Sequence, residues 1–188
     1  HEQEFARIFD KFHPFQRWDR GIMQLLPSWA ESQLADLAQD SETKKDMLLK
    51  ALAHRENGLK LCTEQMRVFE EQSPGNFWTI GDTQYSIGVL LNRLYDVTRN
   101  EEHLTKAAKA FAEAAESYQK VDAKRRIAEC QWKAAQTYDA LGERFKAAEN
   151  FELASTDYRD VSERVPQLKD FYEEYANYMA AWSEIEKA

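Results

Sequence analysis

The stretch AECQWKAAQTYDALGERFKAAENFELASTDYRDV, residues 128–161, decides the fold that this sequence predicts. Small and aromatic residues recur in it at helical offsets: Ala135, Tyr138, Gly142, Ala147, Phe151 and Ala154. The glycine suits the turn between two helices, because it adopts backbone conformations that other residues avoid. Small side chains on facing helices allow the helix axes to approach closely. The stretch therefore predicts two short antiparallel helices that are joined by a tight turn.

Part of the chain repeats this stretch at a shift of 40 residues. Under that shift Phe151 falls on Phe111, and Tyr158 falls on Tyr118. Internal repetition at this period is typical of stacked helical hairpins, because one hairpin alone cannot bury both of its faces. The sequence therefore predicts that further hairpins stack on the first one.

Residues 128–161 resemble one tetratricopeptide repeat, a unit of about 34 residues. The small, aromatic and turn positions of that repeat are matched by Ala135, Tyr138, Gly142, Ala147, Phe151 and Ala154. Its closing proline is absent, and Arg159 stands there instead. The upstream unit, residues 82–121, matches only in its second helix, and the 40-residue period resembles that of the soluble NSF-attachment proteins. The resemblance implies antiparallel helical hairpins stacked as a short tetratricopeptide-like solenoid.

The apolar pattern of the whole chain predicts an all-α protein of about seven or eight helices. The turn signal Ser73–Asn76 separates an N-terminal helical region, residues 1–75, from repeats with a C-terminal capping helix, residues 76–188. We expect both parts to form one continuous domain. The individual helices are expected over residues 28–39, 41–72 and 82–97. Another helix is expected after a cap at Asn100, and three more over residues 124–141, 143–162 and 166–186.

The N-terminal region opens with an aromatic helical face over residues 2–20, interrupted by Pro14. This face either covers the core or docks on a partner or a neighbouring domain. Gly21–Pro27 is interpreted as a connector, and Ser28 with Glu31 as a capping box that begins the next helix.

The composition limits the classes of partner. The net charge of -8 disfavours binding to nucleic acid and to anionic membrane surfaces. No apolar stretch is long enough to cross a membrane, and no signal-peptide layout is present, so a cytoplasmic protein is predicted. Cys62 and Cys130 lie on helical stripes and are predicted to be buried free thiols. The chain lacks an initiator methionine, so we do not assume that it is the whole gene product.

No catalytic constellation is recognisable in the sequence. It has no glycine-rich phosphate loop, no paired cysteine motif and no histidine pair at metal-binding spacing. Asp10 and His13 share a helix face, but this pair is more typical of a surface hydrogen bond than of a metal site. We therefore predict a protein that is not an enzyme and that binds no metal or cofactor.

In tetratricopeptide arrays the first helix of each hairpin lines a concave groove. The resemblance therefore implies groove positions at Glu129, Trp132, Gln136, Asp139, Asn92, Asp96, Lys169 and Tyr172. An exposed tryptophan in such a groove is a typical anchor for a peptide, which makes Trp132 the first candidate. The alternative is that Trp132 packs against the last helix at Tyr172 or Tyr175.

These observations favour a non-catalytic scaffold or adaptor that binds a peptide or helix of another protein in its groove. A ligand- or peptide-sensing regulatory module of a larger signalling protein is the first alternative. A helical-bundle enzyme is the second. The aromatic terminal helices also leave open a homo-oligomer, and the sequence does not identify the partner or the biological process.

Overall fold

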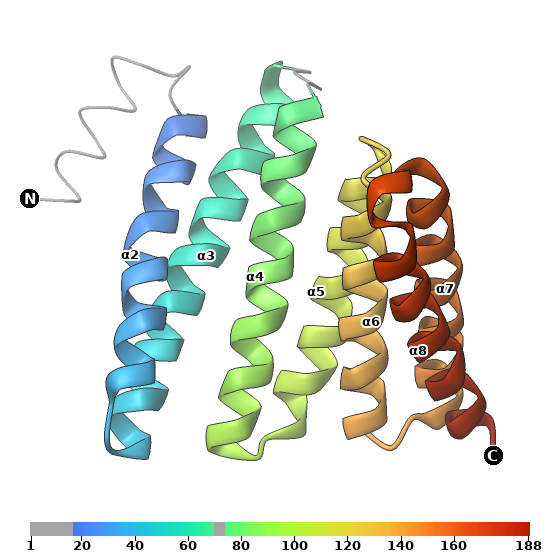
Figure 1. Cartoon of the computed structure of the whole chain (residues 1–188). Coiled ribbons are helices and arrows are strands. Elements are labelled where there is room, and N and C mark those ends of the chain that lie inside the picture. The colour runs from blue at the N-terminus through green and yellow to red at the C-terminus, as the bar shows by residue number, and fades with distance from the viewer. Residues whose placement is uncertain (1–16, 70–73) are drawn as a thin grey trace, which may run out of the picture. The chain divides into compact units, whose positions relative to one another are not determined.

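The computed structural model describes residues 17–69 and 74–188, and this part of the chain is all-α, as predicted (Figure 1). It contains seven α-helices, one 3-10 helix and no β-strand. None of these helices is long and apolar enough to span a membrane. The chain divides into two compact units, His1–Asn76 and Phe77–Ala188. Most of the aromatic face predicted over residues 2–20 lies outside the described residues.

The N-terminal unit contains the antiparallel helices α2 (Arg17–Leu37) and α3 (Ser41–Phe69) (Figure 1). Asp40 caps α3, because its Oδ1 accepts a hydrogen bond of 2.8 Å from the backbone N–H of Thr43. That bond to Thr43 favours the charged carboxylate and lowers the pKa of Asp40. The prediction of a long helix from residue 41 is confirmed as far as Phe69.

The predicted connector at Gly21–Pro27 is wrong, and so is the capping box at Ser28, because α2 continues through Pro27 as one helix. Ser28 is buried, and its hydroxyl donates to the carbonyl of Ala51 over 2.8 Å. The same hydroxyl accepts from Nε of Arg55 over 3.0 Å. A proline inside a helix costs about 3 kcal/mol. These tertiary contacts with α3 favour the helix here despite that cost.

Two glycines set the distance between α2 and α3. A Cβ atom placed on Gly21 would lie 2.9 Å from the carbonyl oxygen of Gly58, and one on Gly58 would lie 2.8 Å from that of Gly21. Both distances are shorter than real Cβ contacts. The helices therefore cross at a point that only glycine permits.

The C-terminal unit begins within the first turn of α4 (Pro74–Thr98), a helix that starts earlier than the predicted residue 82. The turn predicted for Ser73–Asn76 is wrong over its described part, because Pro74 opens the helix. Proline is well tolerated at the first helical position, since the N–H that it lacks has no partner there.

Glycines also bring α4 close to α5 (Glu101–Gln119). A Cβ atom on Gly81 would lie 2.9 Å from the ring of Tyr118, and one on Gly88 would lie 2.7 Å from the ring of Phe111. The two aromatic rings of α5 therefore rest directly on the backbone of α4. Asn100 caps α5, as predicted, and accepts a hydrogen bond of 3.1 Å from the N–H of Glu102.

The stretch 128–161 forms the predicted helical hairpin from α6 (Lys124–Ala140) and α7 (Arg144–Arg164). Gly142 lies in the turn with φ +73°, a left-handed conformation that favours glycine. The small and aromatic positions that face inward are fully or almost fully buried: Ala135, Ala147, Phe151 and Ala154. Tyr138 is half-buried against the same core.

A 3-10 turn (Pro166–Leu168) leads into α8 (Lys169–Lys187), which runs antiparallel to α7 (Figure 1). Near one end the hydroxyl of Ser183 donates to the carbonyl of Ala148 over 2.9 Å. Near the other end the rings of Tyr158 and Tyr172 stack with their centroids 6.2 Å apart. The C-terminal unit is therefore a series of antiparallel helices in which α8 covers the last hairpin.

Candidate protein-interaction surface

One side of α8 packs on α7 and is closed to solvent. Its residues follow at spacings of three and four and are all buried: Tyr172, Ala176, Met179, Ser183 and Glu186. The carboxylate of Glu186 lies 3.4 Å from Nε of Arg144, so this buried charge has a partner of opposite sign. This side of α8 contributes to the core and is not available to a ligand.

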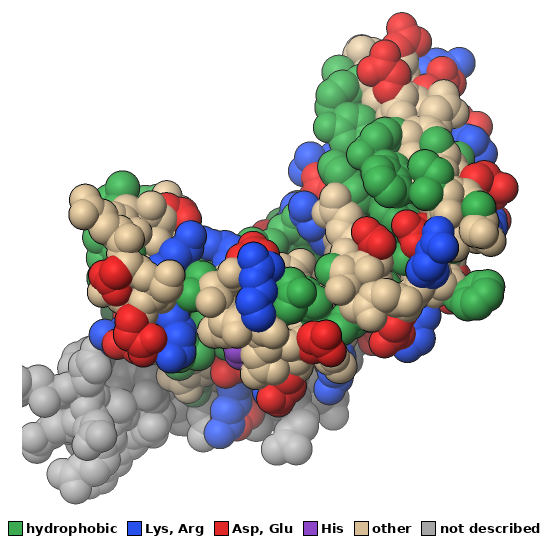
Figure 2. All heavy atoms as spheres, turned by 90° about the horizontal axis from the view of Figure 1, so that it is seen from below, with side chains coloured by type: hydrophobic (Ala, Val, Ile, Leu, Met, Phe, Trp, Pro, Cys, Tyr) green, Lys and Arg blue, Asp and Glu red, His purple; other side chains and the backbone are tan. Residues whose placement is uncertain are grey.

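The neighbouring side of α8 carries a second apolar row, which we call the α8 stripe. The stripe consists of Leu168, at the end of the 3-10 turn, and of Phe171, Tyr175, Tyr178, Trp182 and Ile185 on α8. Leu168 is 48%, Phe171 49%, Tyr178 51% and Ile185 51% exposed. Figure 2 shows a group of hydrophobic side chains at the surface of the C-terminal unit. Exposed apolar residues that form a continuous row on one helix mark a surface that binds another molecule.

The other two members of the α8 stripe hold it in place. The ring of Tyr175 lies 5.8 Å from that of Trp132 on α6 and 5.3 Å from that of Tyr158 on α7. The ring of Trp182 stacks on Phe151 with centroids 6.0 Å apart. These contacts hold two of the six side chains in place, and the exposed members of the stripe lie next to them on the same side of the helix.

Trp132, the predicted anchor, packs against the last helix at Tyr175, which is the alternative left open by the sequence. Its side chain is half-buried, and the ammonium of Lys133 lies 5.3 Å from its ring centre. Its Nε1 is buried and donates to no acceptor among the described residues. A buried unpaired donor costs about 1–3 kcal/mol, which the aromatic contacts must offset. Trp132 therefore supports the α8 stripe more than it forms a separate anchor.

Two of the predicted groove residues are engaged within the unit. The amide of Asn92 on α4 donates to the hydroxyl of Thr137 on α6 over 3.0 Å. Glu129 pairs with Arg125 at 3.2 Å and with Arg126 at 2.5 Å. Asn92 connects two helices, whereas Glu129 pairs within α6, so a partner would have to compete with contacts that are already made.

The remaining predicted residues differ in exposure. Asp96, Gln136 and Asp139 are exposed, and so is Lys169, whose ammonium lies 3.5 Å from the carboxylate of Glu173. Tyr172 is only 8% exposed, because it belongs to the row that packs on α7. The 40-residue shift that placed it in a groove does not extend to α8.

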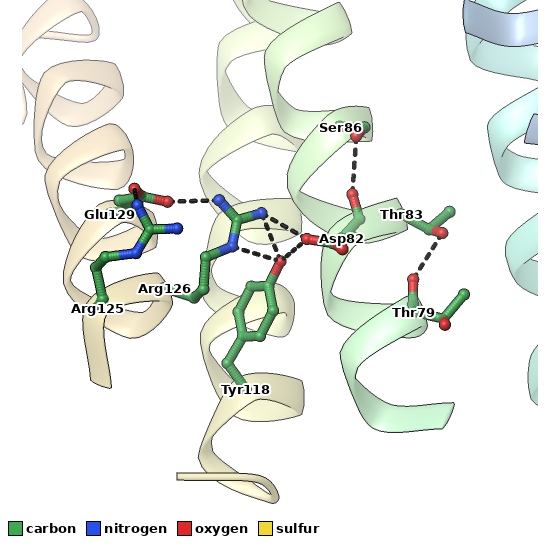
Figure 3. Close-up of polar contacts among 8 residues, drawn as sticks. All are labelled: Thr79, Asp82, Thr83, Ser86, Tyr118, Arg125, Arg126 and Glu129. Atoms are coloured by element: carbon green, nitrogen blue, oxygen red, sulfur yellow. Dashed lines mark hydrogen bonds and ion pairs between the residues drawn. The ribbon is translucent and has the colours of Figure 1, made fainter. Parts of the chain in front are cut away.

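A polar network surrounds Arg126, near the start of α6, and was not predicted from the sequence (Figure 3). The guanidinium lies between two aromatic rings, 4.8 Å from the centre of Tyr85 and 5.0 Å from that of Tyr118. It donates to Asp82 over 2.6 Å and to the hydroxyl of Tyr118 over 2.7 Å. The network thus connects α4, α5 and α6, and no local pattern in the sequence indicated it.

The ionisation states of Tyr118 and Arg126 indicate that this network has a structural role. The hydroxyl of Tyr118 donates to Asp82, and burial together with this bond raises the pKa of Tyr118. Burial opposes the charge of Arg126, but Tyr118, Glu129 and Asp82 raise its pKa overall. Arg126 therefore stays charged and Tyr118 stays protonated at neutral pH, and neither group is poised for proton transfer.

Cys62 and Cys130 are buried thiols that are not joined in a disulfide, as predicted. Burial raises the pKa of Cys62 to about 11 and that of Cys130 to about 12. Thiols of this kind are poor nucleophiles at neutral pH, because the reactive thiolate is scarce. Within residues 17–69 and 74–188, no group of three or more acidic, His or Cys side chains is arranged to hold a metal ion.

Two shallow polar hollows lie between α7 and α8. The larger, of about 290 Å³, is lined by Arg159, Ser162, Glu163, Glu173 and Asn177. The smaller, of about 200 Å³, is lined by Glu152, Ser155, Thr156, Arg159, Ala180, Ser183, Glu184 and Lys187. Their linings are mostly polar, unlike the predominantly apolar linings of typical small-molecule sites. The α8 stripe is thus the stronger candidate surface of this unit.

Comparison of the chain with protein-family models, with curated proteins and with solved structures finds no match.

Proposed function

We propose that this chain is a non-catalytic interaction module, an adaptor or scaffold, whose tetratricopeptide-like C-terminal unit binds a helix of another protein along the α8 stripe. The observation that carries the proposal is the half-exposed aromatic row on a helix whose neighbouring row is already packed on α7. Aromatic side chains dominate the binding energy of protein interfaces. A surface of this composition therefore suits protein recognition.

The spacing of the α8 stripe favours a helical occupant. Leu168, Tyr175 and Trp182 are seven residues apart, and so are Phe171, Tyr178 and Ile185. Together they form the alternating three–four pattern by which two α-helices pack along their length. The pattern continues over residues 168–185, a length that matches several turns of a partner helix.

The charged residues beside the α8 stripe indicate the charge that a partner helix should carry. Asp170 and Glu174 lie on the exposed side of α8 next to Phe171 and Tyr178, and the whole chain carries a net charge of -8. A partner helix that places lysine or arginine along this border gains attraction, whereas an acidic helix is repelled. The proposed partner is therefore an amphipathic helix with an apolar stripe and basic flanks.

The exposed area sets the expected affinity. Complete burial of a large apolar side chain is worth about 1.5–3 kcal/mol, so each half-exposed member of the stripe contributes about 1 kcal/mol. Four such residues give about 4 kcal/mol from this chain, and the apolar stripe of the partner adds a similar amount. The cost of association offsets much of this gain, so the expected binding is weak and reversible.

The proposal is tested with two synthetic helical peptides, each roughly 21 residues long, that share an apolar stripe with three–four spacing, one with lysine flanks and one with glutamate flanks. We expect the full chain to bind the lysine peptide, with Phe171→Ser and Tyr178→Ser each weakening binding about fivefold or more in fluorescence anisotropy. Phe145→Ser is the matched control, since Phe145 on α7 is 86% exposed and lies outside the stripe. Equal losses in the control, or no binding of the lysine peptide, would contradict the proposal.

A further inference from the structure

The N-terminal unit exposes an apolar row on α2 that its own hairpin leaves uncovered. This α2 row consists of Met23, Leu26, Ala30, Leu34 and Leu37. Met23 is 61%, Leu26 69%, Leu34 49% and Leu37 76% exposed, and Ala30 is exposed between them. An exposed row of this length is uncommon on a helix that needs no further partner.

The row lies opposite the side of α2 that packs on α3. From residue 21 to the end of α2, the buried positions are Gly21, Ser28 and Ala35, which are seven residues apart. Met23 follows Gly21 by two residues, and two residues rotate a side chain by about 200° around a helix. The helix therefore packs on α3 with one side and exposes an apolar row on the opposite side, which is typical of a helix that is covered on both.

We propose that a second copy of this chain covers the α2 row, with the two α2 helices packed antiparallel about a two-fold axis at Ala30. The residues of the row are separated by three, four, four and three positions, so the spacing reads the same in both directions. In an antiparallel pair Met23 faces Leu37 of the second copy, and Leu26 faces Leu34. A two-fold interface requires this kind of self-complementarity.

The residues on and beside the axis suit this arrangement. Ala30 meets Ala30 of the second copy, and two small side chains allow the closest approach of the helices. Beside them Pro27 faces Gln33 of the second copy, so no like charges meet at the centre of the contact. Trp29, which is 62% exposed at the edge of the row, adds a large apolar side chain to each half.

The area is sufficient for a weak dimer. The exposed fractions of the α2 row and Trp29 correspond to roughly 600 Å² of accessible surface per copy. The pair would therefore bury at most about 1,200 Å², which is the lower limit for specific interfaces. We therefore expect a reversible dimer whose population rises over the range of roughly 1–100 μM chain.

The test is sedimentation velocity on the full chain between roughly 1 and 200 μM, with substitutions that address the proposed register. Leu26→Glu and Leu34→Lys each place an unpaired charge opposite a leucine and should raise the dimer dissociation constant about tenfold or more. The double variant sets the introduced carboxylate of each copy opposite the introduced ammonium of the other, so it should recover most of the lost affinity. Both positions are exposed, and circular dichroism checks that the helical content is unchanged.

Leu153→Glu is the control, since Leu153 is 47% exposed on α7 in the other unit and should leave the dimer intact. A chain that is monomeric at every concentration would overturn the proposal and would point to residues 1–16 or another protein as the cover of the row. A dimer that survives Leu26→Glu but is lost in Tyr178→Ser would overturn it in favour of pairing through the α8 stripe. The proposal does not depend on the proposed function, because the peptide assay addresses a different unit.

Discussion

Removing Arg126 should destabilise the C-terminal unit more than removing its neighbour Arg125. The substitution Arg126→Met keeps most of the aliphatic length of the side chain but deletes the guanidinium between Tyr85 and Tyr118. It also deletes the donors to Asp82 and Tyr118 (Figure 3). Three helices lose a shared contact, so the effect is expected in the free energy of unfolding.

The magnitude follows from the exposure of each partner. The side chain of Arg126 is 17% exposed and that of Glu129 is 23% exposed, but that of Asp82 is 45% exposed and can be solvated after the substitution. Breaking a fully buried ion pair costs about 3–5 kcal/mol, and an exposed one costs less than about 1 kcal/mol. Two cation–π contacts add about 0.5–2 kcal/mol each. Because Tyr118 still donates to Asp82, we expect a total of roughly 2–3 kcal/mol.

The measurement is urea unfolding of both variants followed by far-UV circular dichroism. Arg125→Met is the matched control, because Arg125 is 52% exposed and reaches Glu129 at 3.2 Å from the same helix turn. We expect the control to lose less than about 1 kcal/mol. A loss for Arg126→Met that is no larger than for the control would refute the idea that this network holds the three helices together.

Three further predictions concern packing and ionisation. Gly88→Ala should lower the free energy of unfolding by roughly 1–3 kcal/mol, because its Cβ would lie 2.7 Å from the ring of Phe111. Ala147→Leu should lower the free energy of unfolding by a similar amount, roughly 1–3 kcal/mol, because Ala147 is fully buried between helices. An unchanged melting temperature in either variant would contradict the packing argument for that position. The pKa of Cys130 is raised from 9.0 to about 12, so below about pH 9 the folded and unfolded states both keep the proton and stability is unaffected. Between about pH 9 and 12 only the unfolded state releases this proton, so the free energy of unfolding should fall by up to about 1.4 kcal/mol per pH unit. Urea titrations at about pH 8, 9.5 and 10.5 measure this fall, and it should be shallower in Cys130→Ala.

The hairpin of residues 128–161 was predictable because its signals are local. Ala135, Gly142 and Phe151 perform their roles within one pair of adjacent helices, so their spacing alone specifies the turn and the contact. The N-terminal unit was less predictable, because the continuity of α2 depends on a contact between Ser28 and Ala51, which are far apart in sequence. Local rules predict a helix break at Pro27, but the contact of Ser28 with α3 favours a continuous α2.

The candidate site was predicted only in part for a related reason. The sequence of α8 shows two adjacent apolar rows, one through Tyr172 and Met179 and one through Phe171 and Tyr178. Either row is apolar enough to face a core, and the 40-residue shift selected the wrong one for exposure. The row that faces the core is identified by contacts between residues far apart in sequence, such as Ser183 with Ala148 and Tyr172 with Tyr158.

The α2 row and the α8 stripe differ in chemistry in a way that suits two different roles. The α2 row is aliphatic, symmetric in spacing and centred on Ala30, whereas the α8 stripe is aromatic and bordered by Asp170 and Glu174. A dimer formed through the first would carry two copies of the second. A partner with two suitably spaced helices would then bind its second site intramolecularly, which raises affinity by about 10²–10⁴ without any new contact. Weak single sites are therefore compatible with firm and selective recruitment, because the affinity depends on pairing of the chain as well as on the stripe itself.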